Sequence, residues 1–242
     1  MLQTKSGAGI NSVYIITCAE TEKTMDIRAY LNFLAVAEKL KCNTRHSWTS
    51  TGRHESVAEH SWRLALMAYL VRDEFPELDM DRVIQMCLFH DMGEAVTGDI
   101  PAFEKSQADE ETEKTAVSRL VEMLPEPCRS EVGALYDEME ARKTPEAKLY
   151  KALDKLEALI QHNEADISTW LPLEYDLQMT YGQEECEVFP YIRRLREIVR
   201  QDSVEKINSH KKIGDNQRIS VLIGVRKRLG WHIFSGKRRR LW

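Results

Sequence analysis

The sequence has few of the residues that interrupt helices, and it has no long apolar run. Only 11 Gly and 7 Pro occur among 242 residues, which favours a helical protein over a β-sandwich or barrel. No apolar stretch reaches the roughly 18 residues of a membrane span, so we expect no membrane partner. Residues 10–19, INSVYIITCA, are apolar but short and lack a basic leading region, which argues against a signal peptide.

Paired cysteines are also absent. The 5 cysteines are odd in number and widely scattered, and no CxxC motif occurs. This distribution argues against a disulfide framework and predicts reduced thiols in an intracellular, cytoplasmic protein.

An excess of positive charge is missing from most of the chain. Residues 206–242 hold 11 of the 34 basic and one of the 39 acidic residues, so residues 1–205 carry 23 basic against 38 acidic residues, a net charge of −15. An acidic body of this kind argues against a nucleic-acid partner. The basic tail, with KRRR at 237–240, stays open as a nuclear address, a nucleic-acid-binding segment or an incidental terminus.

Helical periodicity dominates the chain after Met25. Apolar residues recur at helical spacing from residue 26, and Ser56 with Glu59 forms a capping box that starts a second helix. Residues 41–55 lack periodicity and are expected to form a loop. Further helices are predicted from about residue 79, over 109–124 and 129–142, from Pro145 onward, and over about 184–201 with a kink at Pro190. The sequence therefore predicts an all-α fold, with an N-terminal extension at 1–25 and a poorly ordered or loosely packed tail at 206–242.

Two histidines face the expected core. His60 lies three residues after Val57 and four before Leu64, and His90 follows Met86 at helical spacing. A single histidine on an apolar face is more often a core residue whose neighbours satisfy it than a ligand. Two of them together with acids are a stronger signal.

Carboxylates accompany both histidines. Asp91 and Glu94 follow His90, and Asp154 lies at the margin of the apolar stripe of the helix that begins at Pro145. Buried carboxylates are costly unless they are paired or bind metal, and imidazoles with carboxylates make a donor set for a divalent metal. Spacing alone does not establish that Asp154 meets the others, because that contact is long-range.

The same residues carry a family resemblance. The pattern of His60, His90-Asp91 and Asp154 resembles the metal site of the HD-domain phosphohydrolases. The segments ESVAEHS, HDMGEAVTGDIP and KALDKLEALIQ resemble the 5′-deoxynucleotidase branch of that family over about residues 26–205. The resemblance implies a single HD-domain helical bundle that hydrolyses 2′-deoxyribonucleoside 5′-monophosphates to deoxynucleoside and phosphate. It also suggests a homodimer.

The resemblance also implies a metal centre. One divalent metal, expected to be Mn²⁺, Co²⁺ or Mg²⁺, would be held by His60, His90, Asp91 and Asp154. Glu94 and Asp99, with the carbonyl of Ile100, match family residues that support a second ion in some members. Gly98 provides a turn that brings Asp99 back toward the pocket. The alternative is that Asp99 only closes the turn.

The residues implied in catalysis are Glu94 and Asp91. Glu94 is the candidate for proton handling, either by orienting the attacking water or by protonating the leaving 5′-oxygen. No covalent intermediate is needed, and no serine or cysteine near the motifs suggests one.

Arg45 matches a family arginine that binds phosphate, a role for which a planar guanidinium is suited. Trp48 matches an aromatic platform for the sugar or base. The segment RHSW is closest to the RTGW of eukaryotic members, and its central His46-Ser47 departs from that pattern, which leaves the preference for deoxyribose open. Arg53 and His54 are alternative loop contacts.

Two other interpretations remain. In the first, the chain is another HD phosphohydrolase that acts on a nucleoside triphosphate or a cyclic nucleotide. In the second, it is a non-catalytic, metal-stabilised interaction module whose basic tail binds nucleic acid. A panel of substrates distinguishes the three.

Overall fold

The structure is a computed structural model that describes the backbone of residues 25–230 and the side chains of residues 25–212. The terminal extensions were predicted to be poorly ordered, and their residues 1–24 and 231–242 lie outside the described residues. In chain order the elements are α1 (Ile27–Ala37), η1 (Glu38–Lys41), β1 (Thr44–Trp48), β2 (His54–Ser56), α2 (Val57–Leu70), η2 (Arg72–Glu74), α3 (Met80–Phe89), α4 (Glu94–Thr97), α5 (Gln107–Glu122), α6 (Cys128–Ala141), α7 (Pro145–Glu164), η3 (Ile167–Thr169), α8 (Glu174–Thr180), α9 (Gln183–Glu187) and α10 (Pro190–Gly230), where η marks a 3-10 helix. The predicted all-α class is confirmed.

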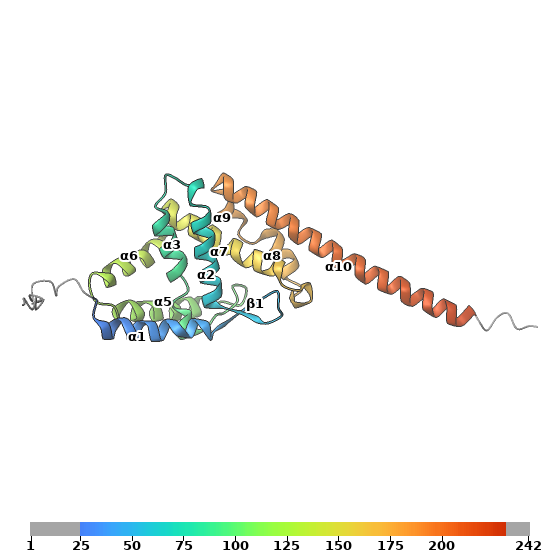
Figure 1. Ribbon diagram of the computed structural model, residues 1–242, viewed down its shortest axis with the longest axis horizontal. Helices are drawn as coiled ribbons and strands as arrows, with labels where there is room; N and C mark the ends of the chain where they lie inside the picture. Colours follow the sequence, from blue (N-terminus) through green and yellow to red (C-terminus); the bar gives the residue numbers. More distant parts are fainter. Residues whose placement is uncertain (1–24, 231–242) are drawn as a thin grey trace, which may run out of the picture.

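Helix α7 is the centre of the bundle. It packs against α2, α3, α9 and α10 (Figure 1). The apolar stripe predicted for this helix is fully buried at Leu149, Leu153 and Leu156, where it joins Leu64 of α2. Burial of this stripe is the main favourable contribution to the packing of the bundle. The polar residues of α7 are therefore carried by a deeply buried helix.

The predicted helix starts at Ser56 and Pro145 are confirmed. The Ser56 hydroxyl accepts a hydrogen bond from the backbone N–H of Glu59, and the Glu59 carboxylate accepts one from the backbone N–H of Ser56. At α7, the Thr144 side chain caps the helix and Pro145 occupies its first position. These caps fix where α2 and α7 begin, and so they set which of their residues face the core.

The sequence predicted a loop over residues 41–55. The structure instead has a two-stranded antiparallel ribbon there. Thr44 pairs with Ser56 and Trp48 with His54, with an irregularity between them. Strands this short and polar give no clear alternation of apolar and polar residues, which explains the error. The ribbon packs against α7 and carries the residues of β1 toward the buried polar groups.

The C-terminal helix also differs from the prediction. The sequence predicted one helix with a kink at Pro190, but α9 ends at Glu187 and α10 begins at Pro190. Proline has no N–H and is best accommodated in the first turn of a helix. Helix α10 then continues to Gly230 and extends away from the bundle, without a break at residue 206 (Figure 1). Among the described helices, none combines the length and the apolar composition that a membrane span needs.

A smaller apolar cluster supports the turn after α3. Its buried residues include Leu40, Met92, Ala95 and Leu120, which come from η1, α4, α5 and the turn itself. The Tyr136 hydroxyl donates a hydrogen bond to the carbonyl of the last residue of α3. These contacts fix the end of α3 and the direction of the two residues that follow it.

Candidate metal centre

Three packed helices bring the candidate metal ligands together. His60 is on the buried face of α2, His90 directly follows α3, and Asp154 is in the middle of α7. Because α2, α3 and α7 all pack against one another, these side chains meet although they are far apart in the sequence. The long-range contact of Asp154, which the spacing left open, is present.

The donor atoms of the four side chains converge on one point. His60 Nε2 is 3.2 Å from His90 Nε2 and 3.1 Å from Asp154 Oδ1. Asp91 Oδ2 is 2.9 Å from His90 Nε2 and 3.8 Å from His60 Nε2. Two imidazoles and two carboxylates therefore share one largely buried position between the helices.

This donor set fits a divalent cation, because imidazole nitrogens and carboxylate oxygens are ligands of borderline and hard metals. The negative charge around His60 also suits a cation. Burial lowers the pKa of His60 and so does nearby Arg45, but the carboxylates of Glu157 and Asp154 raise it by more, to about 9. His60 without a cation therefore holds a second proton at neutral pH. A cation bound at Nε2 would replace that proton and neutralise the same negative charge.

Lys151 holds the second oxygen of Asp154. Its Nζ donates to Asp154 Oδ2 at 2.6 Å from one turn earlier on α7. Burial raises the pKa of Asp154, but the ammonium of Lys151 and the two histidines lower it by more. The pKa of this carboxyl is therefore well below its usual range. Asp154 is therefore ionised, with Oδ1 directed at the imidazoles.

Glu157 holds His60 from the opposite side. This fully buried carboxylate accepts hydrogen bonds from His60 Nδ1, from Arg63 Nε at 2.6 Å and from Arg45 Nη1 at 3.4 Å. Burial raises the pKa of Glu157, but His60 and the two arginines lower it to about 2. An ionised Glu157 keeps the proton of His60 on Nδ1 and leaves Nε2 as the donor atom of the centre.

Glu55, His60 and Glu157 form a second group whose spacing alone would suit a metal. Arg45 Nη1 lies 3.1 Å from Glu55 Oε2, and Arg63 contacts Glu157. Two guanidinium groups thus already neutralise these acids. The group on the Nε2 side of His60, with His90 and Asp91, is therefore the better candidate for a metal.

Glu94 begins α4 and is buried beside the centre. Within the described part of the chain, its Oε2 atom is buried and has no hydrogen-bond partner. Burial, together with the charges of Asp91 and Asp99, raises the pKa of Glu94 to about 10. A buried carboxyl oxygen without a partner next to a metal-type donor set is a further sign that a cation belongs there.

Asp99 and Ile100 follow Gly98, whose φ of 77° makes the expected turn. Asp99 lines a cavity together with Arg45, and burial raises the pKa of its carboxyl although Arg45 opposes the shift. Ile100 lines a different cavity. The turn therefore sends consecutive side chains in different directions.

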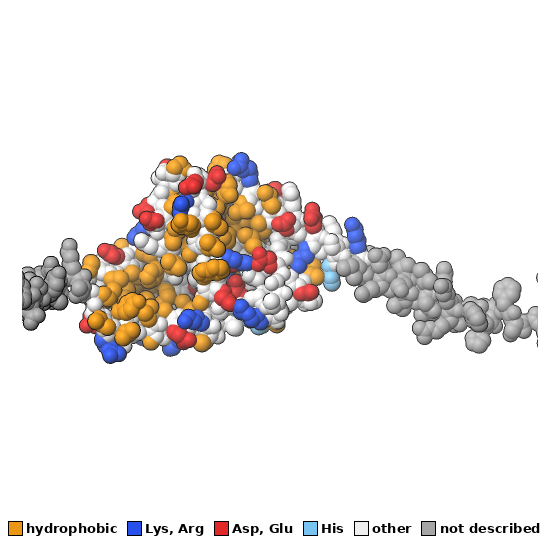
Figure 2. All heavy atoms as spheres, viewed as in Figure 1, with side chains coloured by type: hydrophobic (Ala, Val, Ile, Leu, Met, Phe, Trp, Pro, Cys, Tyr) orange, Lys and Arg blue, Asp and Glu red, His pale blue; other side chains and the backbone are white. Residues whose placement is uncertain are grey.

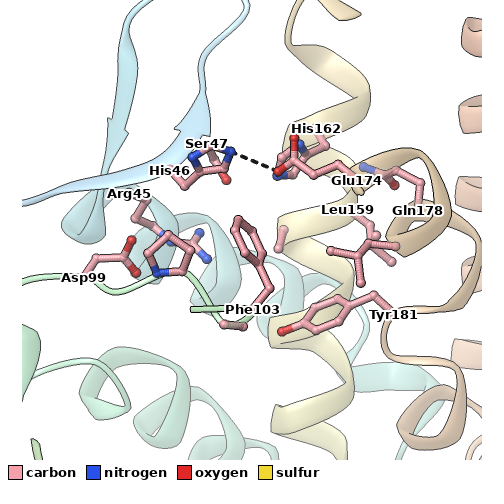
Figure 3. A pocket seen from close by; sticks show the side chains of 14 residues that line it. Arg45, His46, Ser47, Asp99, Phe103, Leu159, His162, Glu174, Gln178 and Tyr181 are labelled. Atoms are coloured by element: carbon pink, nitrogen blue, oxygen red, sulfur yellow. Dashed lines mark ion pairs between the residues drawn. The ribbon is translucent and has the colours of Figure 1, made fainter. Parts of the chain in front are cut away.

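The cavity that Arg45 and Asp99 line has a volume of about 220 Å³. Arg45 and Asp99 lie at one end of it, and His46 and Glu174 face each other across its edge (Figure 3). Its apolar lining is formed by Pro101, Ala102, Phe103, Ala158, Leu159 and Leu177. The cavity is smaller than most small-molecule sites, but its lining has their composition, which is mostly apolar with a few polar groups.

Trp48 lies apart from this cavity although it shares strand β1 with Arg45. Its ring packs against that of His54, with centroids 3.9 Å apart, and the cavity wall is instead formed by His46. The platform role of Trp48 stays a prediction.

The model of the HD domain family matches residues 37–195.

The chain belongs to the HD domain family. Human 5′-deoxynucleotidase HDDC2 is 36% identical over 145 residues, which cover 57% of this chain and 68% of that protein. The 5′-deoxynucleotidase of Erwinia tasmaniensis is 30% identical over 174 residues, covering 66% of this chain and 87% of that protein. The crystal structure of a predicted metal-dependent phosphohydrolase from Magnetospirillum magnetotacticum MS-1 has a TM-score of 0.66 at 30% identity, covering 74% of this chain and 93% of that chain. The family resemblance stated from the motifs is confirmed.

The sequence analysis did not identify the charged residues that contact the candidate ligands. Lys151 and Glu157 lie three residues before and after Asp154, on the same face of α7, so helical spacing could have indicated both once Asp154 was a candidate. Glu55 and Glu174 gave no such signal, because their partners on β1 are brought to them only by the ribbon.

Glu157→Gln should weaken metal binding by about 10- to 100-fold, because it removes the charge that orients His60. The matched control is Glu164→Gln on the same helix, whose half-exposed carboxylate contacts the other end of Arg63. Calorimetric titration of the metal-free chain with Mn²⁺ measures the effect. Equal affinity in both variants would contradict the role assigned to Glu157.

Proposed function

We propose that this HD domain is a metal-dependent 5′-deoxynucleotidase, a phosphoric monoester hydrolase that converts 2′-deoxyribonucleoside 5′-monophosphates to deoxynucleoside and phosphate. The observation that carries the proposal is the convergence of two imidazoles and two carboxylates on one position. Arg45, which lines a cavity, contacts the same Glu157 that holds His60. The human and Erwinia relatives, both called 5′-deoxynucleotidases, support it.

One divalent cation would be held by His60, His90, Asp91 and Asp154. Such an ion supplies Lewis acidity: it lowers the pKa of water toward neutrality and offsets negative charge on phosphoryl oxygens. We propose Mn²⁺, Co²⁺ or Mg²⁺ as the ion. A second ion would find carboxylates at Glu94 and Asp99, with the carbonyl of Ile100 as a further oxygen.

Glu94 is the residue that we assign to proton transfer, and Asp91 is the catalytic carboxylate beside it. Without a cation, burial and the neighbouring acids raise the pKa of Glu94 to about 10, so this carboxyl holds a proton readily. In the reaction it would give that proton to the leaving 5′-oxygen. When ionised, it can instead orient the attacking water. Asp91 contacts His90, and its negative charge raises the pKa of Glu94. Asp91 therefore interacts both with the donor set and with the proton-transferring group.

Arg45 is the residue that we assign to the substrate phosphate. Glu55 and Glu157 hold one nitrogen of its guanidinium, which fixes the group at the end of the cavity. Its other N–H groups can pair with phosphate oxygens. Trp48 remains our candidate for the platform of the sugar or base.

We also propose that residues 26–205 form the catalytic domain and that the protein is a homodimer. Figure 2 shows apolar side chains gathered over α1 and α2. The exposed ones include Tyr30, Leu31, Trp62, Tyr69 and Leu70. A contiguous apolar patch is typical of a protein interface. A monomer mass by light scattering of the full chain would contradict the homodimer.

A panel of phosphate esters tests the function. With Mn²⁺ or Co²⁺ present, we expect phosphate release from dAMP, dGMP and TMP but not from ribonucleotides or triphosphates. Hydrolysis of triphosphates or cyclic nucleotides instead would assign a different HD phosphohydrolase. Absence of hydrolysis, with salt-dependent DNA binding that is lost on deletion of residues 206–242, would assign a non-catalytic module.

Arg45→Ala should raise KM for the monophosphate by roughly 10- to 100-fold, the value of a charge-assisted hydrogen bond, while metal stays bound. Arg53→Ala is the comparison, because Arg53 is on the same ribbon but forms an exposed ion pair with Glu59 at 2.5 Å. Steady-state kinetics with a parallel metal determination measures both. A larger KM effect at Arg53 than at Arg45 would move the phosphate contact to the outer loop.

A further inference from the structure

A cluster of titratable side chains lies in the cavity but outside the metal centre. His46 Nε2 is 3.0 Å from Glu174 Oε1, and His162 Nε2 is 3.6 Å from the same oxygen. The other oxygen of the buried Glu174 accepts a hydrogen bond from the backbone N–H of Leu171 at 2.6 Å. These three side chains come from β1, α8 and α7, and the proposed hydrolysis uses none of them.

The contact between His46 and Glu174 leaves hydrogen-bonding capacity unused. The distance suits an ion pair, yet within the described residues His46 Nε2 is a buried atom with no hydrogen bond of good geometry. Gln178 lies on the same side of the cavity, and its Oε1 accepts from the Ser203 hydroxyl at 3.3 Å, which directs its amide nitrogen elsewhere. A ligand that offers a hydrogen-bonding group to His46 would satisfy this nitrogen.

The remaining walls are apolar and suited to a flat ring. The ring of Phe103 meets that of His46 edge to face, with centroids 5.7 Å apart. Leu159 and Tyr181 lie across from Phe103 (Figure 3). A planar heteroaromatic group has apolar faces and a polar edge, which is the combination that this cavity complements.

We propose that this cavity receives the nucleobase of the substrate, and that His46 and Glu174 bind the polar edge of the base. The inference rests on the proposed function, which assigns the phosphate to Arg45. This residue lies at one end of the cavity and also contacts Glu157, the carboxylate that holds His60. His46 stands at a position where the segment departs from the RTGW pattern that it resembles. The contact is therefore a specificity feature of this chain.

The contact is isolated by comparing a nucleotide with 2-deoxyribose 5-phosphate, which has no base. His46→Ala should lower kcat/KM for dAMP and TMP by about tenfold, the value of one hydrogen bond to a charged group, mainly through KM. The value for 2-deoxyribose 5-phosphate should not change. His46→Gln should recover part of the loss, and His210→Ala, at an exposed histidine of α10, should match the wild type.

An equal loss on both substrates, or no loss on either, would overturn the inference. Calorimetric binding of 2′-deoxyadenosine, which has a base but no phosphate, keeps the test independent of turnover. Binding that His46→Ala weakens, in a chain that hydrolyses no monophosphate, would support the base site and refute the proposed function. Hydrolysis of monophosphates with nucleoside binding that ignores His46 would refute the base site alone.

Discussion

The hydrogen bond between His60 and Glu157 is the contact on which the site depends. Both side chains are fully buried between α2 and α7, so each charge needs a partner that water cannot supply. Arg63 and Arg45 complete the neutralisation of Glu157. Because Nδ1–H of His60 donates its hydrogen bond to Glu157, the Nε2 atom is left to face His90 and Asp154.

Arg45 connects this interior network to the substrate cavity. The carboxylates that fix its guanidinium are the same ones that surround His60, so the phosphate contact and the metal centre share one rigid support. A buried charge network of this kind seldom adds to stability, since desolvation offsets much of the attraction. Its value lies in holding the donor atoms in place before any ligand arrives.

The sequence predicted those features of the fold that depend on neighbouring residues. The capping box at Ser56 and the proline start of α7 are local patterns, and both helices begin where these patterns indicate. The family motifs also led to His60, His90 and Asp154, whose side chains meet in the structure. The ribbon after η1 could not be predicted in this way, because its short polar strands pair only when packed against α7.

The contact between His46 and Glu174 in the cavity could not be predicted from the sequence. His46 and Glu174 are separated by most of the chain, and neither lies in a periodic apolar pattern that indicates its direction. Their contact depends on how β1 and α8 are placed around α7. The same holds for Trp48, which is next to the cavity residues on β1 but packs against His54.

Metal content is the most direct measure of the central claim that four distant side chains share one divalent ion. The wild-type chain, loaded with Mn²⁺ and freed of excess ion, should retain at least one ion per chain. The control variant Asp202→Asn, which changes an exposed carboxylate, should retain as much. Asp154→Asn removes one carboxylate from the centre and should lose most of the ion while keeping its helical circular dichroism. Full retention of the ion by folded Asp154→Asn would contradict the account.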